Sequence, residues 1–226
     1  MRFIQKTPLP ESLAAQFAAK QATLDAGGTS GWNPSKEQKK RLGQHLLPIQ
    51  KHICCYCEKQ FDNNPHHIEH FIEQHDDKTK TYDYENLFLS CEGESTKKDN
   101  DENTSCGHKK TDSRHANTPI NYNLLLNPAN IATQNCFEYE DSGKIIPNKK
   151  SAGSQQQALY TIKRLNLDNQ RLKNERQTAI ITLEKEINGL SDSEIKTFLA
   201  NLFDEKQTRS PNFYSALFQN FAFLLS

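Results

Sequence analysis

The sequence predicts an α+β protein in which a small cysteine-containing core of short strands lies between two helical regions. Four cysteines fall in a polar, turn-rich stretch, 54–110, whose apolar residues lack helical periodicity. Apolar residues with helical spacing precede this stretch and return after it. We therefore expect four segments: a helical segment at 1–47, the cysteine module at 48–118, a connecting hairpin with loops at 119–150, and a helical region at 151–226.

The composition is that of a polar, soluble protein large enough to bury a core. The chain has 226 residues, 35% of them hydrophobic, and a mean hydropathy of -0.84. Its 28 basic residues balance 28 acidic ones, so nucleic-acid binding would have to come from local clusters of charge. No apolar run is long enough for a membrane span, and no signal-peptide core follows Met1. We expect a cytoplasmic protein with no membrane partner, whose cysteines are better interpreted as metal ligands than as disulfides.

Two helices are predicted before the cysteine module. The first covers Pro10–Leu24, where apolar residues recur on one face. The second begins at Ser35, which forms a capping-box pattern with Gln38, and ends before Pro48. A solvated helix face is the more frequent explanation for the basic residues of this second helix, although a phosphate-contacting role is also open; they are Lys36, Lys39, Lys40 and Arg41.

The C-terminal region reads as a series of helices with recognisable caps. Asp168 is the expected N-cap of a long helix, and Gly189 lies where that helix should end. Ser191 and Glu194 form a second capping-box pattern, and Ser210 with Pro211 should open the last helix.

Short strands are predicted within and after the cysteine module. Three candidate strands lie at 53–56, 68–72 and 87–91, and a polar insertion at 92–105 follows the third. Further on, 121–127 and 136–146 could pair as a hairpin, because Asp141-Ser142-Gly143 is a turn signal between apolar runs.

A local excess of positive charge lies between Lys149 and Arg176. This stretch has seven basic residues against two acidic ones. Clusters of this kind are typical of contact with a phosphate backbone. We expect the nucleic-acid contacts to include Lys163, Arg164 and Arg171.

Four cysteines have the composition of a structural zinc site. Cys54 and Cys57 are separated by two residues, which allows both sulfurs of one turn to face one ion. Cys91 and Cys106 are separated by fourteen residues. The entropy cost of closing such a loop grows only logarithmically with its length. We expect these four thiolates to hold one Zn²⁺; the alternative is four unrelated buried cysteines, and Cys55 and Cys136 are left over.

A second group of residues has the parts needed for metal-assisted hydrolysis of a phosphodiester. His70 can take a proton from water, and the adjacent Glu69 can hold a divalent cation. Asn86 can fix the tautomer of a histidine, and His108 can complete the protein shell of the metal while leaving open positions. We give His67 only a secondary role, since it lies on the strand face opposite His70.

The order of these motifs resembles a known family. The sequence contains Cys-x-Tyr-Cys-Glu at 54–58, Ile-Glu-His-Phe at 68–71, Asn-Leu-x-x-Ser-Cys at 86–91 and Cys-Gly-His-x-Lys at 106–110. This combination looks like the HNH endonuclease family with the ββα-metal fold. More narrowly, it is similar to the PtuB-type HNH proteins of Septu and retron-associated anti-phage defence. The similarity covers most of residues 50–180.

The resemblance implies a role for each motif residue. His70 matches the general base, Glu69 the acidic ligand of a catalytic Mg²⁺ or Mn²⁺, Asn86 the residue that orients the base, and His108 the second ligand. The four cysteines match structural zinc ligands. Lys110 matches a phosphate contact, and we also expect Lys109 to contact the nucleic acid. Three departures stand out: Glu69 replaces the commoner Asp, Glu73 lies where a proline often follows the catalytic histidine, and Gly107 follows the fourth cysteine where His or Asn is common.

The resemblance further implies nucleic acid as the substrate, with DNA favoured over RNA, and a partner ATPase of the PtuA type in anti-phage defence. The competing hypothesis is a catalytically inactive, zinc-stabilised module that binds nucleic acid or protein. The simultaneous presence of Glu69, His70, Asn86 and His108 favours the enzyme, because a purely structural module would not require them.

Overall fold

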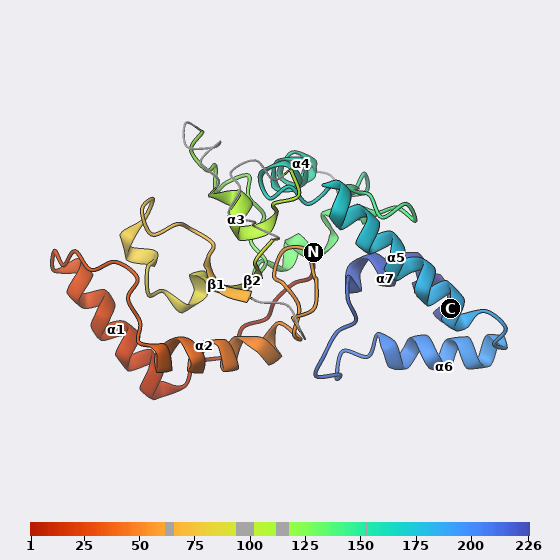
Figure 1. The fold of residues 1–226 in the computed structure, drawn as a ribbon, viewed down its shortest axis with the longest axis horizontal. Helices are drawn as coiled ribbons and strands as arrows, with labels where there is room; N and C mark the ends of the chain where they lie inside the picture. The colour runs from red at the N-terminus through yellow and green to blue at the C-terminus, as the bar shows by residue number, and fades with distance from the viewer. Residues whose placement is uncertain (62–65, 94–101, 112–117, 152) are drawn as a thin grey trace.

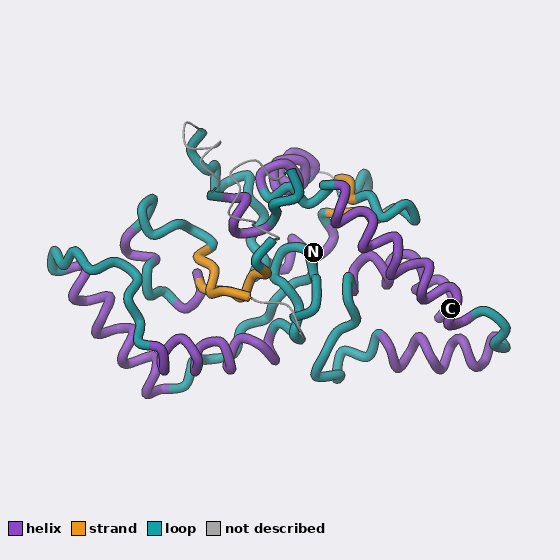
Figure 2. Tube along the Cα trace, in the orientation of Figure 1, coloured by secondary structure: helices purple, strands orange, loops and turns teal. Residues whose placement is uncertain are grey.

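A computed structural model of the chain describes residues 1–61, 66–93, 102–111, 118–151 and 153–226. The molecule is elongated, with α1 (Glu11–Asp25) and α2 (Lys36–Ile49) at one end and α6 (Asp192–Leu202) at the other (Figure 1). The hairpin of β1 (His66–His70) and β2 (Leu87–Cys91) lies between them, together with α3 (Cys106–Lys110). Within the described residues the fold is α+β, because helices dominate and the strands form two short antiparallel pairs (Figure 2). Part of the predicted insertion, 94–101, lies outside these residues.

The two N-terminal helices are α1 (Glu11–Asp25) and α2 (Lys36–Ile49). The capping box of α2 is confirmed: Ser35 Oγ accepts from the amide of Gln38, and the Gln38 side chain accepts from the amide of Ser35. The predicted end of this helix before Pro48 is wrong, because Pro48 lies within the last turn of α2 and the helix ends at Ile49. Leu13 and Leu42 are among the residues that these helices bury in the core.

The central hairpin pairs β1 (His66–His70) with β2 (Leu87–Cys91), so that His66 faces Cys91 and His70 faces Leu87. Two single-turn 3-10 helices, η1 (Lys78–Lys80) and η2 (Tyr84–Asn86), lie in the connection. The short helix α3 (Cys106–Lys110) packs against β2. The strand predicted at 53–56 is wrong, since only Ile53 forms a bridge, with Gln60. The chain turns at 55–57 because Cys54 and Cys57 must face the same point.

The second hairpin pairs β3 (Phe137–Tyr139) with β4 (Ile145–Pro147), after the 3-10 helix η4 (Ile131–Asn135). Its turn at 141–143 is as predicted, whereas 121–127 forms turns and no strand. Gly143 has φ +77°, and a Cβ atom there would collide with the backbone oxygen of Lys173. The turn therefore requires glycine.

Four helices and a final 3-10 turn form the described C-terminal region. They are α4 (Gln155–Arg164), α5 (Gln170–Ile187), α6 (Asp192–Leu202), α7 (Tyr214–Phe221) and η5 (Ala222–Leu225). The capping box of Ser191 with Glu194 is confirmed. Asn169, and not Asp168, caps α5, because the Asp168 carboxylate accepts from the amide of Ile145 at 3.2 Å.

The last helix begins at Tyr214, later than predicted. The preceding segment is held against the cysteine turn by backbone hydrogen bonds, from Ser210 N to Lys51 O and from Phe213 N to Glu58 O, both 3.0 Å. The buried Glu58 carboxylate also accepts from the amide and the hydroxyl of Ser215, each at 2.6 Å. The C-terminal region is thus fastened to the cysteine turn at several points.

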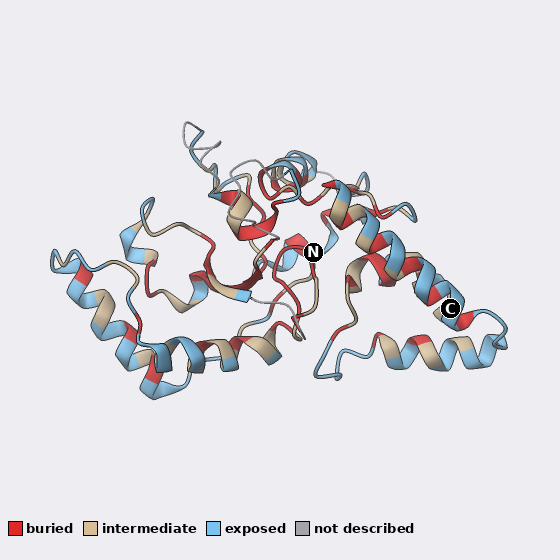
Figure 3. Cartoon of the chain, viewed as in Figure 1, coloured by how far each residue is buried: buried red, intermediate tan, exposed pale blue. Residues whose placement is uncertain are grey.

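The main core takes residues from all four predicted segments, and its buried side chains concentrate around the hairpin and α3 (Figure 3). A second apolar cluster fills the arm formed by α5, α6 and α7, and it consists of Ile180, Leu183, Ile187, Leu199, Phe203, Leu217 and Phe221. None of the described helices combines the length and apolar character needed to cross a bilayer.

Candidate metal centre

Four buried thiols from three elements converge on one point. Cys54 and Cys57 come from the turn, Cys91 ends β2, and Cys106 begins α3. The sulfurs of Cys54 and Cys106 are 3.9 Å apart, those of Cys57 and Cys91 are 3.7 Å apart, and none forms a disulfide. Zinc–sulfur bonds of about 2.3 Å in a tetrahedron imply sulfur–sulfur separations of about 3.8 Å. The cluster could therefore hold a metal such as zinc, as the sequence predicts.

The local backbone supports this convergence. Cys106 has φ +59°, and its amide donates to Leu165 O at 2.9 Å, which fixes the start of α3. The amide of Cys91 donates to the sulfur of Cys54 at 3.4 Å. Burial raises the pKa of Cys54, but hydrogen bonds from the neighbouring thiols outweigh burial and hold this pKa well below its usual value.

The other two cysteines are buried but lie outside this group. The amide of Cys55 donates to Leu89 O at 3.1 Å, and burial raises the pKa of its thiol well above the usual value. The thiol of Cys136 donates to Ala132 O at 3.0 Å.

A second group of possible ligands lies beside the first and consists of His67, Glu92 and His108. His108 Nε2 is 2.7 Å from the carboxylate of Glu92, and the two imidazole rings are 4.6 Å apart. His67 Nδ1 is buried without a hydrogen-bond partner among the described residues, although Glu92 Oε1 is 3.4 Å away. Two imidazoles and a carboxylate are a ligand set that suits a transition metal and leaves coordination positions open.

Glu69 lies next to this group on the same face of β1 as His67. Its Oε2 is 3.3 Å from His67 Nε2, and its Oε1 accepts from Tyr56 Oη at 3.0 Å and pairs with the ammonium of Lys110. Burial raises the pKa of Glu69, but Lys110 and His67 outweigh burial and lower this pKa to about 2. Glu69 is therefore ionised and already paired.

Lys110 has a different place from the one predicted. Its side chain is fully buried, and its ammonium contacts the carboxylates of Glu69 and Glu73 and the backbone oxygens of His70 and Phe71. The predicted phosphate contact of Lys110 is wrong, because its ammonium group is buried and already bound by these four acceptors. Lys109, the other residue expected to contact phosphate, is only partly exposed.

The residue after the fourth cysteine, Gly107, has no room for a side chain. A Cβ atom at this position would collide with Glu69 Oε2, and it would lie 2.8 Å from Glu69 Cδ and 3.0 Å from His67 Nε2. The backbone of α3 thus approaches the carboxylate and the imidazole as closely as it can. Any side chain here would displace one of them.

His70 points away from Glu69, since successive residues of a strand face opposite sides. Its Nε2 is 2.9 Å from Thr81 O, and its ring packs edge-on against Trp32 with centroids 4.8 Å apart. A carbonyl oxygen only accepts, so the proton is on Nε2 and Nδ1 carries the free lone pair. Burial lowers the pKa of His70, and the Thr81 carbonyl only partly offsets this, so the ring is neutral at pH 7.

Asn86 does not contact the ring of His70 in the way the sequence predicts. Its Oδ1 accepts from the amide of Ile72 at 2.7 Å, and its Nδ2 donates to Ile72 O at 2.8 Å and Lys80 O at 2.9 Å. The side chain instead fixes the loop that carries the Thr81 carbonyl. The predicted direct contact between Asn86 and His70 is therefore wrong. Asn86 acts on His70 only through the loop whose Thr81 carbonyl lies 2.9 Å from His70 Nε2.

Three of the seven basic residues predicted to form a footprint at 149–176 make contacts within the protein, and two of these are buried. Arg164 is buried and donates to Thr118 O at 3.0 Å, while Arg176 is buried and donates to Gly143 O at 2.6 Å. Arg171 bonds to Ser105 Oγ at 2.9 Å and pairs with Glu175. The predicted phosphate contact is wrong for Arg164 and Arg176, because both are buried and donate to backbone carbonyls of loops. Lys163, in contrast, is exposed.

His67 and Glu92 are possible metal ligands that we did not predict from the sequence. The signal for His67 was present, since it is two residues before Glu69 and so shares its strand face. Glu92 directly follows Cys91, but it was assigned to the polar insertion. Its carboxylate reaches the histidines because β2 ends in the four-cysteine cluster.

Comparison of the chain with models of known protein families and with curated protein sequences finds no match.

Removing one sulfur should release the metal of the cysteine cluster. Purified Cys57→Ala should hold far less than the one zinc per chain expected of a four-ligand site, and it should unfold at a lower temperature. Cys136→Ala, which removes a buried thiol outside the cluster, should retain its zinc. Metal analysis and thermal unfolding measure both. Retention of one zinc per chain by Cys57→Ala would exclude Cys57 as a ligand.

Adding one methyl group at Gly107 should destabilise the site. We expect Gly107→Ala to lower the free energy of unfolding by roughly 1–3 kcal/mol, as overpacking does. The matched control is Gly43→Ala in α2, where no heavy atom lies within 4 Å of the new Cβ position and the higher helix propensity of alanine should stabilise by about 1 kcal/mol. Denaturant unfolding compares them, and a stabilising Gly107→Ala would contradict the packing described here.

Proposed function

We propose that this protein is a metal-dependent HNH-type endonuclease whose hairpin and α3 form a ββα-metal core. The observation that carries the proposal is the second ligand group: β1, the residue after β2 and α3 supply two imidazoles and a carboxylate within 4.8 Å of one another. The position of His67 Nδ1 supports it, because this buried nitrogen has no hydrogen-bond partner among the described residues and lies 3.4 Å from Glu92 Oε1, which belongs to the same ligand group.

In this proposal Glu69 positions a ligand, in place of serving as one. The carboxylate accepts a hydrogen bond from His67 Nε2, which directs Nδ1 of the same ring toward the metal. Carboxylate–histidine–metal arrangements of this kind fix the tautomer and raise the basicity of the ligand. The ligands would then be His67, Glu92 and His108. Two imidazoles favour Mn²⁺ over Mg²⁺ as the catalytic ion.

His70 is the proposed general base. Its Nδ1 is free to take the proton of the attacking water, while Thr81 O holds the proton on Nε2 and Asn86 holds the loop next to Thr81. A divalent cation would supply stabilisation of the charge that develops on the phosphate and the leaving oxygen. The sequence resemblance supports DNA as the favoured substrate and, further, a partner ATPase of the PtuA type in anti-phage defence.

The non-catalytic alternative rests on one specific observation. The buried ammonium of Lys110 neutralises Glu69, and this ion pair would also suit a purely structural core. A module of that kind would keep the zinc cluster and bind nucleic acid or protein without cutting. The alternative does not account for His67 Nδ1, which is buried and has no hydrogen-bond partner among the described residues.

Cleavage of supercoiled plasmid tests the proposal. The purified protein should nick or linearise DNA with Mn²⁺, more slowly with Mg²⁺, and not after chelation of the added metal. His70→Ala should reduce the rate by about 10²–10⁴-fold, the usual contribution of a general base. His75→Ala is the matched control, because that imidazole is exposed and five residues away along the chain. Unchanged cleavage by His70→Ala would refute the assigned role, and inactivity of the wild-type protein on DNA and RNA would favour the non-catalytic module.

A further inference from the structure

A groove of about 590 Å³ lies between α2 and the central hairpin. Its basic side consists of Lys39 and Lys40 of α2, and its apolar side includes Trp32, Leu47, Ile68 and Leu89. His66 and His67 of β1 also line it. The groove thus combines positive charge, apolar surface and one of the proposed metal ligands.

We propose that this groove binds an unpaired stretch of nucleic-acid strand and guides it to the metal centre. The inference rests on the proposed function, since the groove is lined by one proposed metal ligand and by a residue that packs on the proposed base. His67 lines the groove and belongs to the ligand group, and Trp32 lines the groove and packs on the ring of His70. A strand lying here would reach the metal ligands and the general base.

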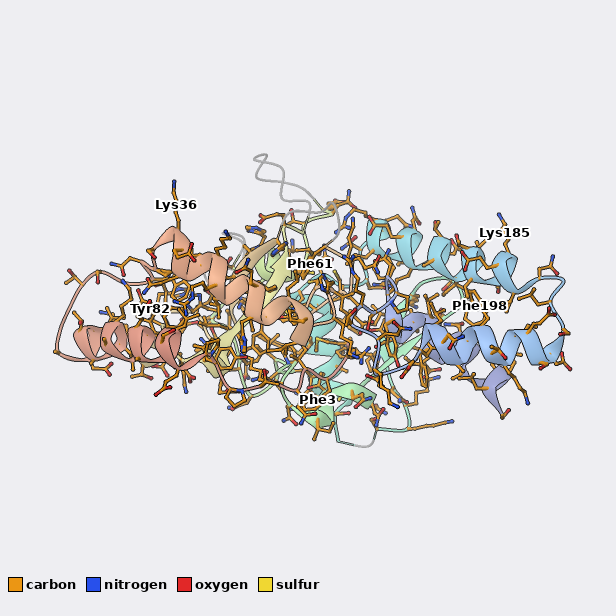
Figure 4. All side chains as sticks on the ribbon, turned by 90° about the horizontal axis from the view of Figure 1, so that it is seen from below. Phe3, Lys36, Phe61, Tyr82, Lys185 and Phe198 are labelled. Atoms are coloured by element: carbon orange, nitrogen blue, oxygen red, sulfur yellow. The ribbon has the colours of Figure 1, made fainter. Side chains whose placement is uncertain are left out.

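The two lysines supply the phosphate contacts. Lys39 and Lys40 are exposed on α2, and their ammonium groups form no ion pair with any residue that the structure describes. Arg41, in contrast, is engaged with Ser12 Oγ at 2.6 Å. Lys36 projects into solvent from the start of the same helix (Figure 4). Although the net charge of the whole chain is zero, one side of the groove therefore carries positive charge that can contact phosphates.

The apolar side favours a single strand over a duplex. Trp32 and Leu47 are partly exposed at the groove, and Ile68 is partly exposed beside them. Stacking on an aromatic or apolar surface requires bases whose faces are accessible, and a duplex buries those faces against each other. Because every base has such a face, binding of this kind tolerates any sequence.

Gly43 gives an independent reason to place a ligand here. It lies in the middle of α2, where glycine is less favourable than alanine by about 1 kcal/mol. No heavy atom lies within 4 Å of the position of an added Cβ, so packing within the described protein does not require glycine. Gly43 lines the groove, and close approach of a ligand to the helix backbone would account for it.

Binding can be measured separately from cleavage. The probe is a fluorescein-labelled single-stranded DNA oligonucleotide of mixed sequence, compared with the same strand annealed to its complement. Fluorescence anisotropy with the His70→Ala protein, without added divalent cation, prevents cleavage during the titration. We expect the single strand to bind at least tenfold more tightly than the duplex.

Two sets of variants test the groove. Lys39→Gln with Lys40→Gln should weaken binding of the single strand at least tenfold, and should reduce the slope of log K against log salt by about 1.4, which is about 0.7 for each lost phosphate contact. The control changes two exposed lysines of the arm formed by α5, α6 and α7, Lys185→Gln with Lys196→Gln; Lys185 lies at the far end of the molecule from Lys36 (Figure 4). Gly43→Gln should weaken binding at least fivefold by filling the groove, and the smaller Gly43→Ala should weaken it at least twofold, because its methyl group would meet a strand that lies against the helix backbone.

The outcomes separate this inference from the proposed function. Equal binding of single strand and duplex, or equal effects of the groove and control lysines, would overturn the groove as a strand site, even if the wild-type protein cleaves DNA. Groove-dependent binding of the single strand by a wild-type protein that cuts neither DNA nor RNA would support the groove and refute the nuclease.

Discussion

The convergence of four sulfurs is the constraint on which the candidate site depends. An isolated two-stranded hairpin is at best marginally stable in water, and α3 has only five residues. The cysteine cluster joins the turn at 54–57, the end of β2 and the start of α3, and structural zinc contributes about 10–16 kcal/mol in zinc-finger peptides. Because Glu92 follows Cys91 and His108 lies two residues after Cys106, the position of the sulfurs also determines where the proposed ligands lie.

The two faces of β1 have different tasks in the proposed enzyme. One face carries His67 and Glu69, which meet α3 so closely that Gly107 has no room for a side chain. The other carries His70, whose proton is fixed by a backbone carbonyl. The groove beside α2 is lined from both faces, by His67 of the first and by His66 and Ile68 of the second. In the proposed enzyme the metal and the base would therefore approach one strand of nucleic acid from opposite faces of β1.

The predictions that succeeded follow from local chemistry. Capping boxes identify helix starts because the bonds form within four residues, and four cysteines in one polar module indicate a shared ion. The predictions that failed depend on tertiary partners. Lys110 and the buried arginines have the sequence appearance of phosphate contacts, yet buried carboxylates and loop carbonyls occupy them. Glu92 gave no sequence signal, since an acidic residue in a polar segment is ordinarily solvated.

We propose that two metal sites of different chemistry share one hairpin. Crystals of the protein grown with Mn²⁺, with anomalous difference maps on either side of the zinc edge, would locate both ions. We expect a zinc peak about 2.3 Å from the sulfurs of all four clustered cysteines, and a separate manganese peak within bonding distance of His67 Nδ1, Glu92 and His108. A single peak at the cysteines, or a second peak that His67 does not contact, would exclude the pair of sites.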